Sequence, residues 1–144
     1  MDKLIPCIML IDDDEATTIY NEIIIEDAAC AVKIISYNSA EEALVHLSTL
    51  FDETKPNPDL ILLDINMPRM NGWEFLEAYS VLKENNKIDN TIVMLSTTYD
   101  EEEYEKADKH QLLNGIKSKP LTMDNLEEIK KIYFEGTRDR IEDM

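Results

Sequence analysis

The sequence has few basic residues. Only 14 of its 144 residues are Lys or Arg, against 31 Asp or Glu, so the formal net charge is −17. A charge of this sign repels phosphate backbones and anionic lipid headgroups, and no Lys/Arg cluster offsets it locally. Direct binding to nucleic acid or to a membrane is therefore disfavoured, and we expect partners that are proteins, cations or both.

Cysteine is also scarce, and no export signal is visible. The two cysteines, Cys7 and Cys30, lack metal-ligand spacing and fall in stretches that read as buried. Two reduced core thiols are therefore favoured over a disulfide. The apolar stretch at residues 4–11 is interrupted by Pro6, and no small-residue cleavage site follows it. We accordingly expect a cytoplasmic location.

The length and composition predict one globular domain. Hydrophobic residues make up 44% of the chain and charged residues 31%, which is neither the composition of a disordered tail nor that of a membrane protein. A chain of this size buries roughly two thirds of its unfolded surface, enough for a single core. We expect one domain over residues 1–144, with a core at about 4–135, a charged tail at 136–144 and no separate output module.

Short apolar runs alternate with segments of helical periodicity, a pattern typical of strands and helices around a parallel sheet. The predicted strands are Cys7–Ile11, Val32–Tyr37, Leu60–Leu63, Thr91–Leu95 and Gly115–Ser118. The predicted helices are Glu15–Ala29, Ala40–Leu50, Gly72–Glu84, Glu101–Leu113 and Met123–Phe134. The first, third and fourth strands are almost wholly apolar, as expected for central strands covered on both faces, whereas the second is amphipathic and fits an edge. Ser39, Asp100 and Thr122 are predicted helix caps, and capping also suffices to explain Asp14.

The residues just after the predicted strands carry the chemistry. In an open parallel sheet, ligands bind at the carboxyl ends of the strands. Four of these ends are followed by carboxylate, hydroxyl or amine side chains: Asp12, Asp13, Asp14 and Glu15; Asp64; Ser96, Thr97 and Thr98; and Lys119. These groups are expected to converge on one rim of the sheet.

Carboxylates on adjacent strands repel one another unless a cation lies between them, and hard oxygen ligands suit Mg²⁺. Lys119 and Ser96 would then supply a fixed charge and a hydroxyl for the oxygens of a phosphoryl group. That arrangement describes an aspartyl phosphate, in which a carboxylate is the nucleophile. Each residue alone has an ordinary structural explanation, but the joint pattern favours a phosphoryl-accepting site.

The chain resembles the receiver domains of two-component response regulators over essentially its whole length. The resemblance rests on LILLDINMPRMNGWEFL at 60–76, IMLIDDDE at 8–15, VMLST at 93–97 and KSKPLT at 117–122. It implies a flavodoxin-like, doubly wound α/β fold with five parallel strands in the order 2-1-3-4-5 and five helices. It also implies a stand-alone regulator of bacterial signalling, similar in design to chemotaxis, phytochrome-linked or phosphorelay regulators.

The resemblance further assigns roles to individual residues. It implies that Asp64 is the phosphate acceptor and that Mg²⁺ is held by Asp12, Asp13, Asp64 and the backbone carbonyl of Asn66. It implies phosphoryl contacts from Ser96, Thr97 and Lys119. It also implies a cis peptide at Pro120 that orients the lysine. A histidine kinase or a phosphotransfer protein would donate the phosphoryl group to a monomer or weak dimer. The chain would act as a switch rather than a conventional enzyme: it catalyses its own phosphoryl transfer and slow dephosphorylation, and its fourth helix, fifth strand and fifth helix repack.

Three residues depart from the family pattern. Ile116 stands where many members have a switch Tyr or Phe, which weakens the expectation of an aromatic flip. Thr97 stands where Ala or Gly is frequent, so we expect narrower access and slower phosphorylation or hydrolysis. Lys117 interrupts the fifth strand where an apolar residue is usual, and we interpret it as an edge lysine that blocks strand pairing.

Two other functions are weighed against this one. A phosphatase resembling the haloacid dehalogenases needs Asp-x-Asp-x-Thr or Val, but Ala16 stands at the last place of that motif. A binding module on the same fold that needs no phosphorylation is the third class, because a fold alone does not fix an activity.

The remaining polar and aromatic residues receive structural interpretations. We interpret His46 and His110 as surface or helix-end residues, and Trp73 and Phe75 as packing residues. The acidic run at 100–105 is interpreted as a solvated helix start, whose charge can also select a basic partner.

Overall fold

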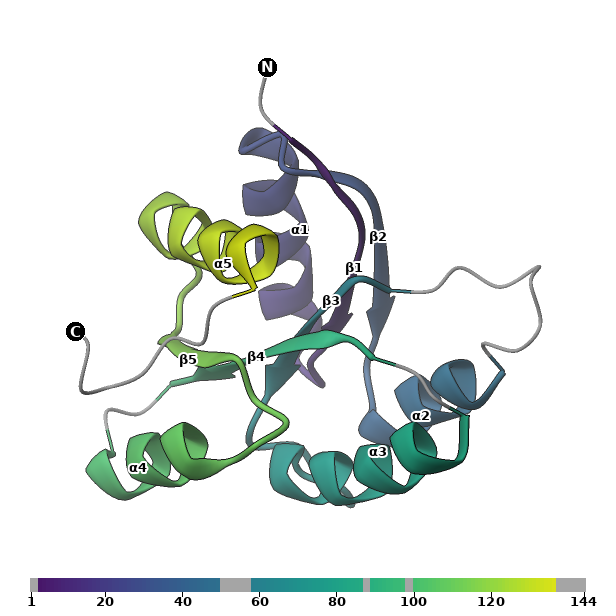
Figure 1. Cartoon of the computed structure of the whole chain (residues 1–144). Coiled ribbons are helices and arrows are strands. Elements are labelled where there is room, and N and C mark those ends of the chain that lie inside the picture. Colours follow the sequence, from purple (N-terminus) through teal and green to yellow (C-terminus); the bar gives the residue numbers. More distant parts are fainter. Residues whose placement is uncertain (1–2, 50–57, 87–88, 98–99, 137–144) are drawn as a thin grey trace.

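The computed structural model describes residues 3–49, 58–86, 89–97 and 100–136. Five strands alternate with five helices along these residues (Figure 1). In order they are β1 (Ile5–Ile11), α1 (Glu15–Asp27), β2 (Ala31–Tyr37), α2 (Ala40–Ser48), β3 (Leu60–Asp64), α3 (Gly72–Asn86), β4 (Thr91–Ser96), α4 (Glu101–Lys109), β5 (Gly115–Ser118) and α5 (Met123–Glu135).

All strand pairs are parallel, and the order in the sheet is β2-β1-β3-β4-β5. Ile11 lies opposite Leu63, and Asp64 lies opposite Leu95, so neighbouring central strands end at nearly the same level. The predicted fold class and strand order are confirmed. The amphipathic β2 is an edge strand, as its pattern predicted, because only its inner edge is paired.

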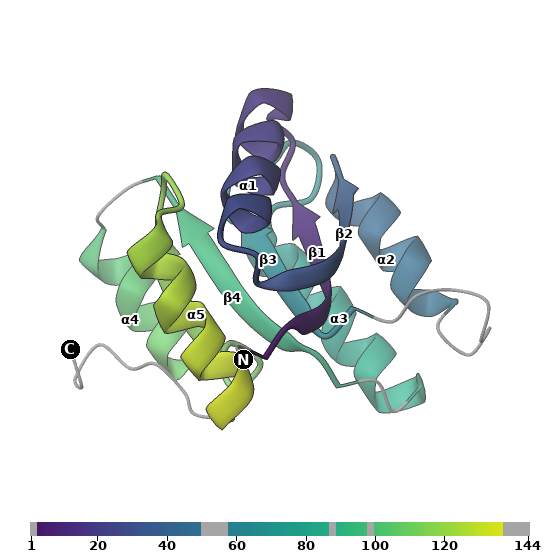
Figure 2. The same ribbon diagram turned by 90° about the horizontal axis from the view of Figure 1, so that it is seen from above.

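Helices cover both faces of the sheet (Figure 2), with α1 and α5 on one face and α2, α3 and α4 on the other. Successive residues of β3 face opposite layers, as strand geometry requires: Leu62 packs with residues of α1 and α5, and Leu63 packs with those of α2 and α3. Every residue of β3 is therefore buried. The two cores hold the carboxyl ends of β1, β3 and β4 in fixed relative positions.

The helix starts are set by side chains that accept backbone N–H groups. The predicted caps are confirmed: Asp14 accepts from Thr17, Ser39 from Glu42, Asp100 from Glu102 and Thr122 from Asn125. Asn71 and Glu74 form a reciprocal pair of the same kind before α3. Each helix that follows a strand therefore begins close to the carboxyl rim.

Three helices end earlier than their periodicity predicted, among them α2, which ends at Ser48. The chain leaves helical geometry at His110, where ψ is 120°, so α4 does not reach Leu113. Leu113 is nevertheless buried in the core, because the turn that follows α4 directs it there. Its burial matches the apolar period of the helix, which is why the period predicted a longer helix. Similarly, α1 stops at Asp27 because Ala29 takes a positive φ of 50°.

Two side-chain interpretations need correction. His46 lies in the last turn of α2, as the helix-end interpretation predicted, but it is buried rather than at the surface, and its Nδ1 lies 2.7 Å from the hydroxyl of Tyr37. Lys117 does not guard the strand edge, because its side chain is buried against α5, with Nζ 2.5 Å from Oε2 of Glu128. In each case the sequence did not reveal the polar partner that lets the side chain be buried.

Other interpretations hold. Phe75 is fully buried, Trp73 packs against the same core, and Cys7 and Cys30 are free, buried thiols. The predicted tail beyond Gly136 lies outside the described residues, as does Leu50 at the predicted end of the second helix. Among the described helices, none combines the length and the apolarity that crossing a bilayer requires.

Candidate functional site

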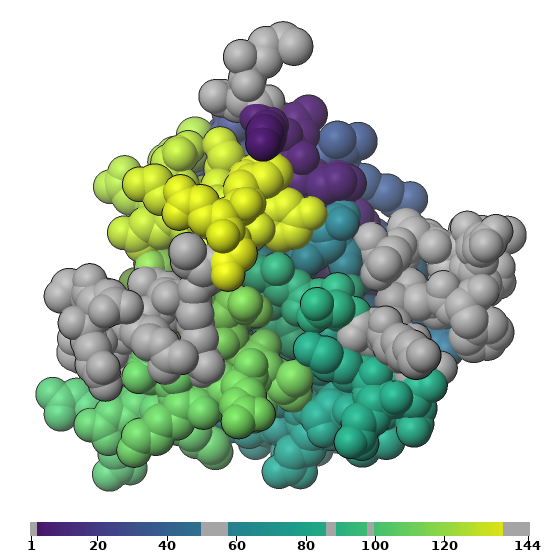
Figure 3. Space-filling view, in the orientation of Figure 1, coloured from purple at the N-terminus to yellow at the C-terminus, as the bar shows by residue number. Residues whose placement is uncertain are grey.

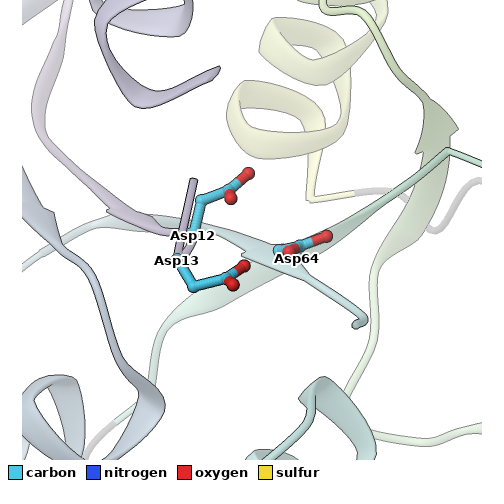
Figure 4. Close-up of side chains that lie close together, drawn as sticks. All are labelled: Asp12, Asp13 and Asp64. Atoms are coloured by element: carbon cyan, nitrogen blue, oxygen red, sulfur yellow. The ribbon is translucent and has the colours of Figure 1, made fainter. Parts of the chain in front are cut away.

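Three carboxylates meet at the carboxyl rim of the sheet. Asp12 and Asp13 directly follow β1, Asp64 ends the neighbouring β3, and the pairing of these strands brings their ends together. One carboxylate oxygen from each residue lies within 4.8 Å of the other two. Figure 4 shows the three side chains turned the same way from the ends of the two strands. Asp12 and Asp64 are buried, whereas Asp13 is exposed, so the group opens to solvent on one side.

The ammonium of Lys119 joins two of these carboxylates. Its Nζ lies 2.6 Å from Oδ2 of Asp12 and 2.9 Å from Oδ1 of Asp64. The other oxygen of Asp12 accepts the N–H of Asp14 at 2.9 Å. The backbone N–H of Lys119 donates to the carbonyl of Ser96 at 2.7 Å, which ties the loop after β5 to the end of β4. The lysine is therefore positioned through both its backbone and its side chain.

Burial and charge shift the ionisation of this pair. Burial raises the pKa of the Asp64 carboxyl, and the neighbouring Asp12 and Asp13 add to the rise, against the opposing effect of Lys119. Burial alone would lower the pKa of the Lys119 ammonium, but its hydrogen bonds to Asp12 and Asp64 outweigh burial and raise it. The ammonium of Lys119 therefore stays protonated. The pKa of Asp64 stays raised, because Lys119 only partly offsets the effects of burial and of the neighbouring carboxylates.

Ser96 and Thr97 lie at the end of β4, on the other side of Asp64. Ser96 is buried, and its hydroxyl donates to Oε2 of Glu103 at 3.4 Å. Thr97 is exposed and, together with Lys119 and Pro120, lines an open hollow of about 450 Å³ against α1. The hydroxyl of Thr97 therefore borders the approach to the rim from the α1 side.

The remaining predicted residues lie around this rim. The peptide between Lys119 and Pro120 is cis, as the resemblance implied. Asn66 is exposed in the loop that follows β3. Ile116 is buried in the core between the sheet and α4, so the place where many receiver domains carry an aromatic switch is filled by an aliphatic side chain.

Two residues beside the rim were missed as functional candidates. A Cβ added at Gly72 would lie 2.7 Å from the backbone oxygen of Asp64, so only glycine lets α3 begin this close to β3. The scarcity of glycine, three in the whole chain, is the signal that could have marked it. Glu103 contacts Ser96 although seven positions separate them, and its place in an acidic helix start gave no hint of that contact.

The residues present fit a hard divalent cation. Asp12, Asp13 and Asp64 supply oxygen ligands, which Mg²⁺ prefers, and the partly open group leaves room for the water molecules that this ion retains. Lys119 already neutralises part of the charge on Asp12 and Asp64, but none of the described lysines is paired with Asp13. An acidic triad of this kind is typical of the receiver Mg²⁺ site.

Comparisons with known proteins agree with the fold described above. A crystal structure of a two-component response regulator from Cytophaga hutchinsonii is 29% identical, with a TM-score of 0.82, over 92% of this chain and 99% of that one. The bacteriophytochrome response regulator AtBRR, at 19% identity over 92% of this chain and 94% of that one, has the same fold, with a TM-score of 0.72.

Two curated relatives match at the level of sequence. The two-component response regulator ARR12 of Arabidopsis thaliana is 27% identical over 94% of this chain, which spans only 20% of the plant protein. Sporulation initiation phosphotransferase F of Bacillus subtilis (strain 168) is 32% identical over 56% of this chain and 61% of its own length. Residues 8–131 match the family described as the response regulator receiver domain. This chain therefore belongs to the receiver domain family of response regulators.

Proposed function

We propose that this receiver accepts a phosphoryl group on Asp64 and thereby switches the surface that it presents to a partner. The observation that supports this most is the pairing of one lysine ammonium with a buried carboxylate inside an acidic triad. A carboxylate oxygen of Asp64 attacks phosphorus, and the bond from phosphorus to the donor breaks. The donor keeps the electron pair of that bond and is then protonated by solvent.

The residues around Asp64 divide the work of holding the charged group. Lys119 donates to the phosphoryl oxygens after transfer, from the position in which it now contacts Asp64. Ser96 offers its hydroxyl, and Thr97 borders the same approach. Asp12, Asp13, Asp64 and the carbonyl of Asn66 would hold Mg²⁺, which neutralises negative charge on the phosphoryl oxygens when bound.

The donor is proposed to be a histidine kinase or a phosphotransfer protein, since receiver domains partner with these classes. The hollow beside Lys119 and Thr97 supports docking of a protein, because Ala16, Tyr20 and Pro120 line it with largely apolar surface. We expect this exchange in the cytoplasm, with the chain a monomer or weak dimer. The buried free thiols of Cys7 and Cys30 suit a reducing compartment.

The output surface is proposed to be formed by α4, β5 and α5. Figure 3 shows α4 in green and α5 in yellow on the same visible face of the molecule. α4 begins beside Ser96 through the contact with Glu103, and β5 leads directly to Lys119. If phosphorylation changes the contact of Glu103 with Ser96, α4 would carry the change to this face. If it changes the contact of Lys119 with Asp64, β5 would do so.

The test is the intact mass of the protein after incubation with acetyl phosphate, with and without Mg²⁺. We expect one phosphoryl adduct that requires Mg²⁺ and disappears in Asp64→Asn, whereas Asp13→Ala loses the metal dependence. Labelling of Asp64→Asn at the wild-type level would overturn the assignment of the acceptor. Absence of an adduct on folded wild-type protein, even with a cognate kinase, would favour a binding module that works without phosphorylation.

A further inference from the structure

The contact between Ser96 and Glu103 joins the candidate phosphoryl site to α4. Ser96 ends β4 with 1% of its surface exposed, and Glu103 lies in the first turn of α4. The Ser96 hydroxyl donates to Oε2 of Glu103 at 3.4 Å. Glu101 and Glu102, the other acidic residues of that turn, are exposed, whereas Glu103 is half-buried. One carboxylate of the acidic turn is thus directed to the serine that the proposed function requires.

This contact competes with the proposed role of Ser96. A serine hydroxyl has one proton to donate, so it cannot be fully donated to Glu103 and to a phosphoryl oxygen at once. The bond is long, at 3.4 Å, but its acceptor is a carboxylate, and hydrogen bonds to charged acceptors are stronger than those to neutral ones. Binding of the hydroxyl to a phosphoryl group therefore requires the bond to Glu103 to be given up.

Charge acts in the same direction. A phosphoryl group on Asp64 brings additional negative charge to a rim that already holds three carboxylates. The carboxylate of Glu103 is half-buried beside the buried Ser96 and repels that added charge, and burial weakens the screening of this repulsion. Phosphorylation therefore disfavours the present position of Glu103 even before the hydroxyl turns.

We propose that Glu103 is a positioning residue that retains the Ser96 hydroxyl in the unphosphorylated protein and releases it when Asp64 is phosphorylated. The inference rests on the proposed function and adds to it a residue that couples the site to α4. Release of Glu103 frees the first turn of α4 from β4. The contact between Ser96 and Glu103 thus couples the phosphoryl site to α4 without an aromatic side chain at the position of Ile116.

The test compares Glu103→Gln with Glu102→Gln. Each variant removes one negative charge from the first turn of α4, but only Glu103 contacts Ser96. We expect Glu103→Gln to speed labelling by acetyl phosphate and Mg²⁺ by about 2- to 10-fold, because the amide oxygen of Gln is a weaker acceptor than a carboxylate and carries no charge that repels the phosphoryl group. Glu102→Gln should change the rate less than about twofold, as exposed charges do. Equal rates in the two variants would overturn the proposal, provided that both melt near the wild-type temperature.

A double-mutant cycle with Ser96→Ala separates the effect of the contact between Ser96 and Glu103 from the effect of removing a negative charge. Without the hydroxyl, Glu103→Gln should lose its advantage over Glu102→Gln, and an unchanged advantage would show that Glu103 acts independently of Ser96. If labelling of Ser96→Ala is too slow to compare, the same cycle is run on the affinity for beryllium trifluoride, a phosphoryl mimic. Wild-type protein that takes up neither phosphoryl group nor mimic refutes the proposed function. Labelled wild type with equal variants refutes only the role of Glu103.

Discussion

The ammonium of Lys119 lies 2.9 Å from the Oδ1 of Asp64, although 55 positions separate the two residues in the sequence. β4 lies between their strands in the sheet, so the lysine reaches over the end of β4 to make this contact. The hydrogen bond from its backbone N–H to the carbonyl of Ser96 fixes the loop at the crossing point. The contact therefore depends on strand order rather than on local sequence.

Lys119→Met is expected to reduce labelling of Asp64 by acetyl phosphate about 100-fold or more, because the variant removes a fixed positive charge from a partly buried site. The methionine keeps most of the side-chain volume, so the loss reports charge and not packing. Lys33→Met on the exposed face of β2 is the matched control and should label like wild type. A normal rate in Lys119→Met, measured by intact mass over time, would contradict the role proposed for the lysine.

Asp64→Asn is expected to stabilise the fold while abolishing labelling. The folded pKa of Asp64 is raised, so folding favours its neutral form and the charged form weakens stability at neutral pH. Replacement by the uncharged amide should raise the melting temperature by roughly 2–4 °C in the absence of metal. Glu77→Gln, an exposed change in α3, is the control and should leave the temperature unchanged. A lower melting temperature for Asp64→Asn would show that the contact with Lys119 stabilises the folded protein by more than the burial of the Asp64 charge destabilises it.

Addition of Mg²⁺ should raise the melting temperature of the wild type, because a ligand that binds only the folded state stabilises it. The rise should grow with Mg²⁺ concentration and should be smaller in Asp64→Asn, which lacks one of the three carboxylates. Differential scanning calorimetry with Mg²⁺ and then with excess chelator measures both effects. An equal rise in the two proteins would place the bound ion away from Asp64.

The residues that sequence alone could place are those at strand ends. Asp12, Asp64, Ser96 and Lys119 each follow a short apolar run, and a parallel sheet collects the carboxyl ends of its strands at one edge. Two regularities, the apolar period and the topology rule, are therefore enough to predict that these residues meet. Other local patterns predicted the edge position of β2, from its amphipathic sequence, and the helix caps, from Ser, Thr and Asp at capping positions.

The residues that sequence could not place depend on contacts across elements. The contact of Glu103 with Ser96 follows from how α4 sits on the sheet, and the burial of Lys117 follows from the facing position of Glu128 on α5. Neither contact has a period or a fixed spacing. The close approach of Gly72 to Asp64 is likewise a matter of distance between backbones, which no local pattern encodes.

Gly72→Ala is expected to disturb both stability and labelling. Its Cβ would lie 2.7 Å from the backbone oxygen of Asp64 and 3.0 Å from the Cα of Ile65, so backbone must shift. Overpacking of this kind costs about 1–3 kcal/mol, measurable by urea unfolding, and the shift should slow labelling because it moves Asp64 itself. Gly136→Ala is the control: its Cβ would meet no atom within 4 Å, so only the positive φ is strained and labelling should be unaffected. Wild-type stability in Gly72→Ala would contradict the close approach.

The pair formed by Lys117 and Glu128 should behave as a half-buried ion pair. The lysine side chain is 7% exposed and the glutamate side chain 57%. Glu128→Ala therefore leaves a buried ammonium without the carboxylate of Glu128, which offsets the cost of burying its charge. We expect a loss of about 1–2 kcal/mol in urea unfolding, less than for a fully buried pair. Lys117→Met should recover much of that loss in the double variant, because an apolar side chain suits the position. Glu127→Ala, which breaks a longer pair with Lys130 on the same helix, is the control and should cost less, because that pair is 3.5 Å apart and its lysine side chain is 16% exposed.

Trp73 should report the position of α4. It is the only tryptophan in the chain, and Nζ of Lys106 lies 4.3 Å from the centroid of its ring. The ring of His110 lies 6.2 Å from it, so two residues from α4 and its C-cap face one fluorophore on α3. If release of Glu103 shifts α4, the cation moves relative to the ring and the emission intensity changes. We therefore expect acetyl phosphate with Mg²⁺ to change the emission of wild type, and Mg²⁺ alone to change it far less.

The design of this measurement separates α4 from other sources of signal. Lys106→Ala should shrink the change, because it removes the cation over the ring, whereas the neighbouring Lys109→Ala should preserve it. Asp64→Asn should give no change with either addition. A full signal in Lys106→Ala would show that Trp73 senses something other than α4. An unchanged spectrum in wild type whose phosphorylation is proven by mass would place the switch on β5 and α5, because α4 would then keep its contacts with α3.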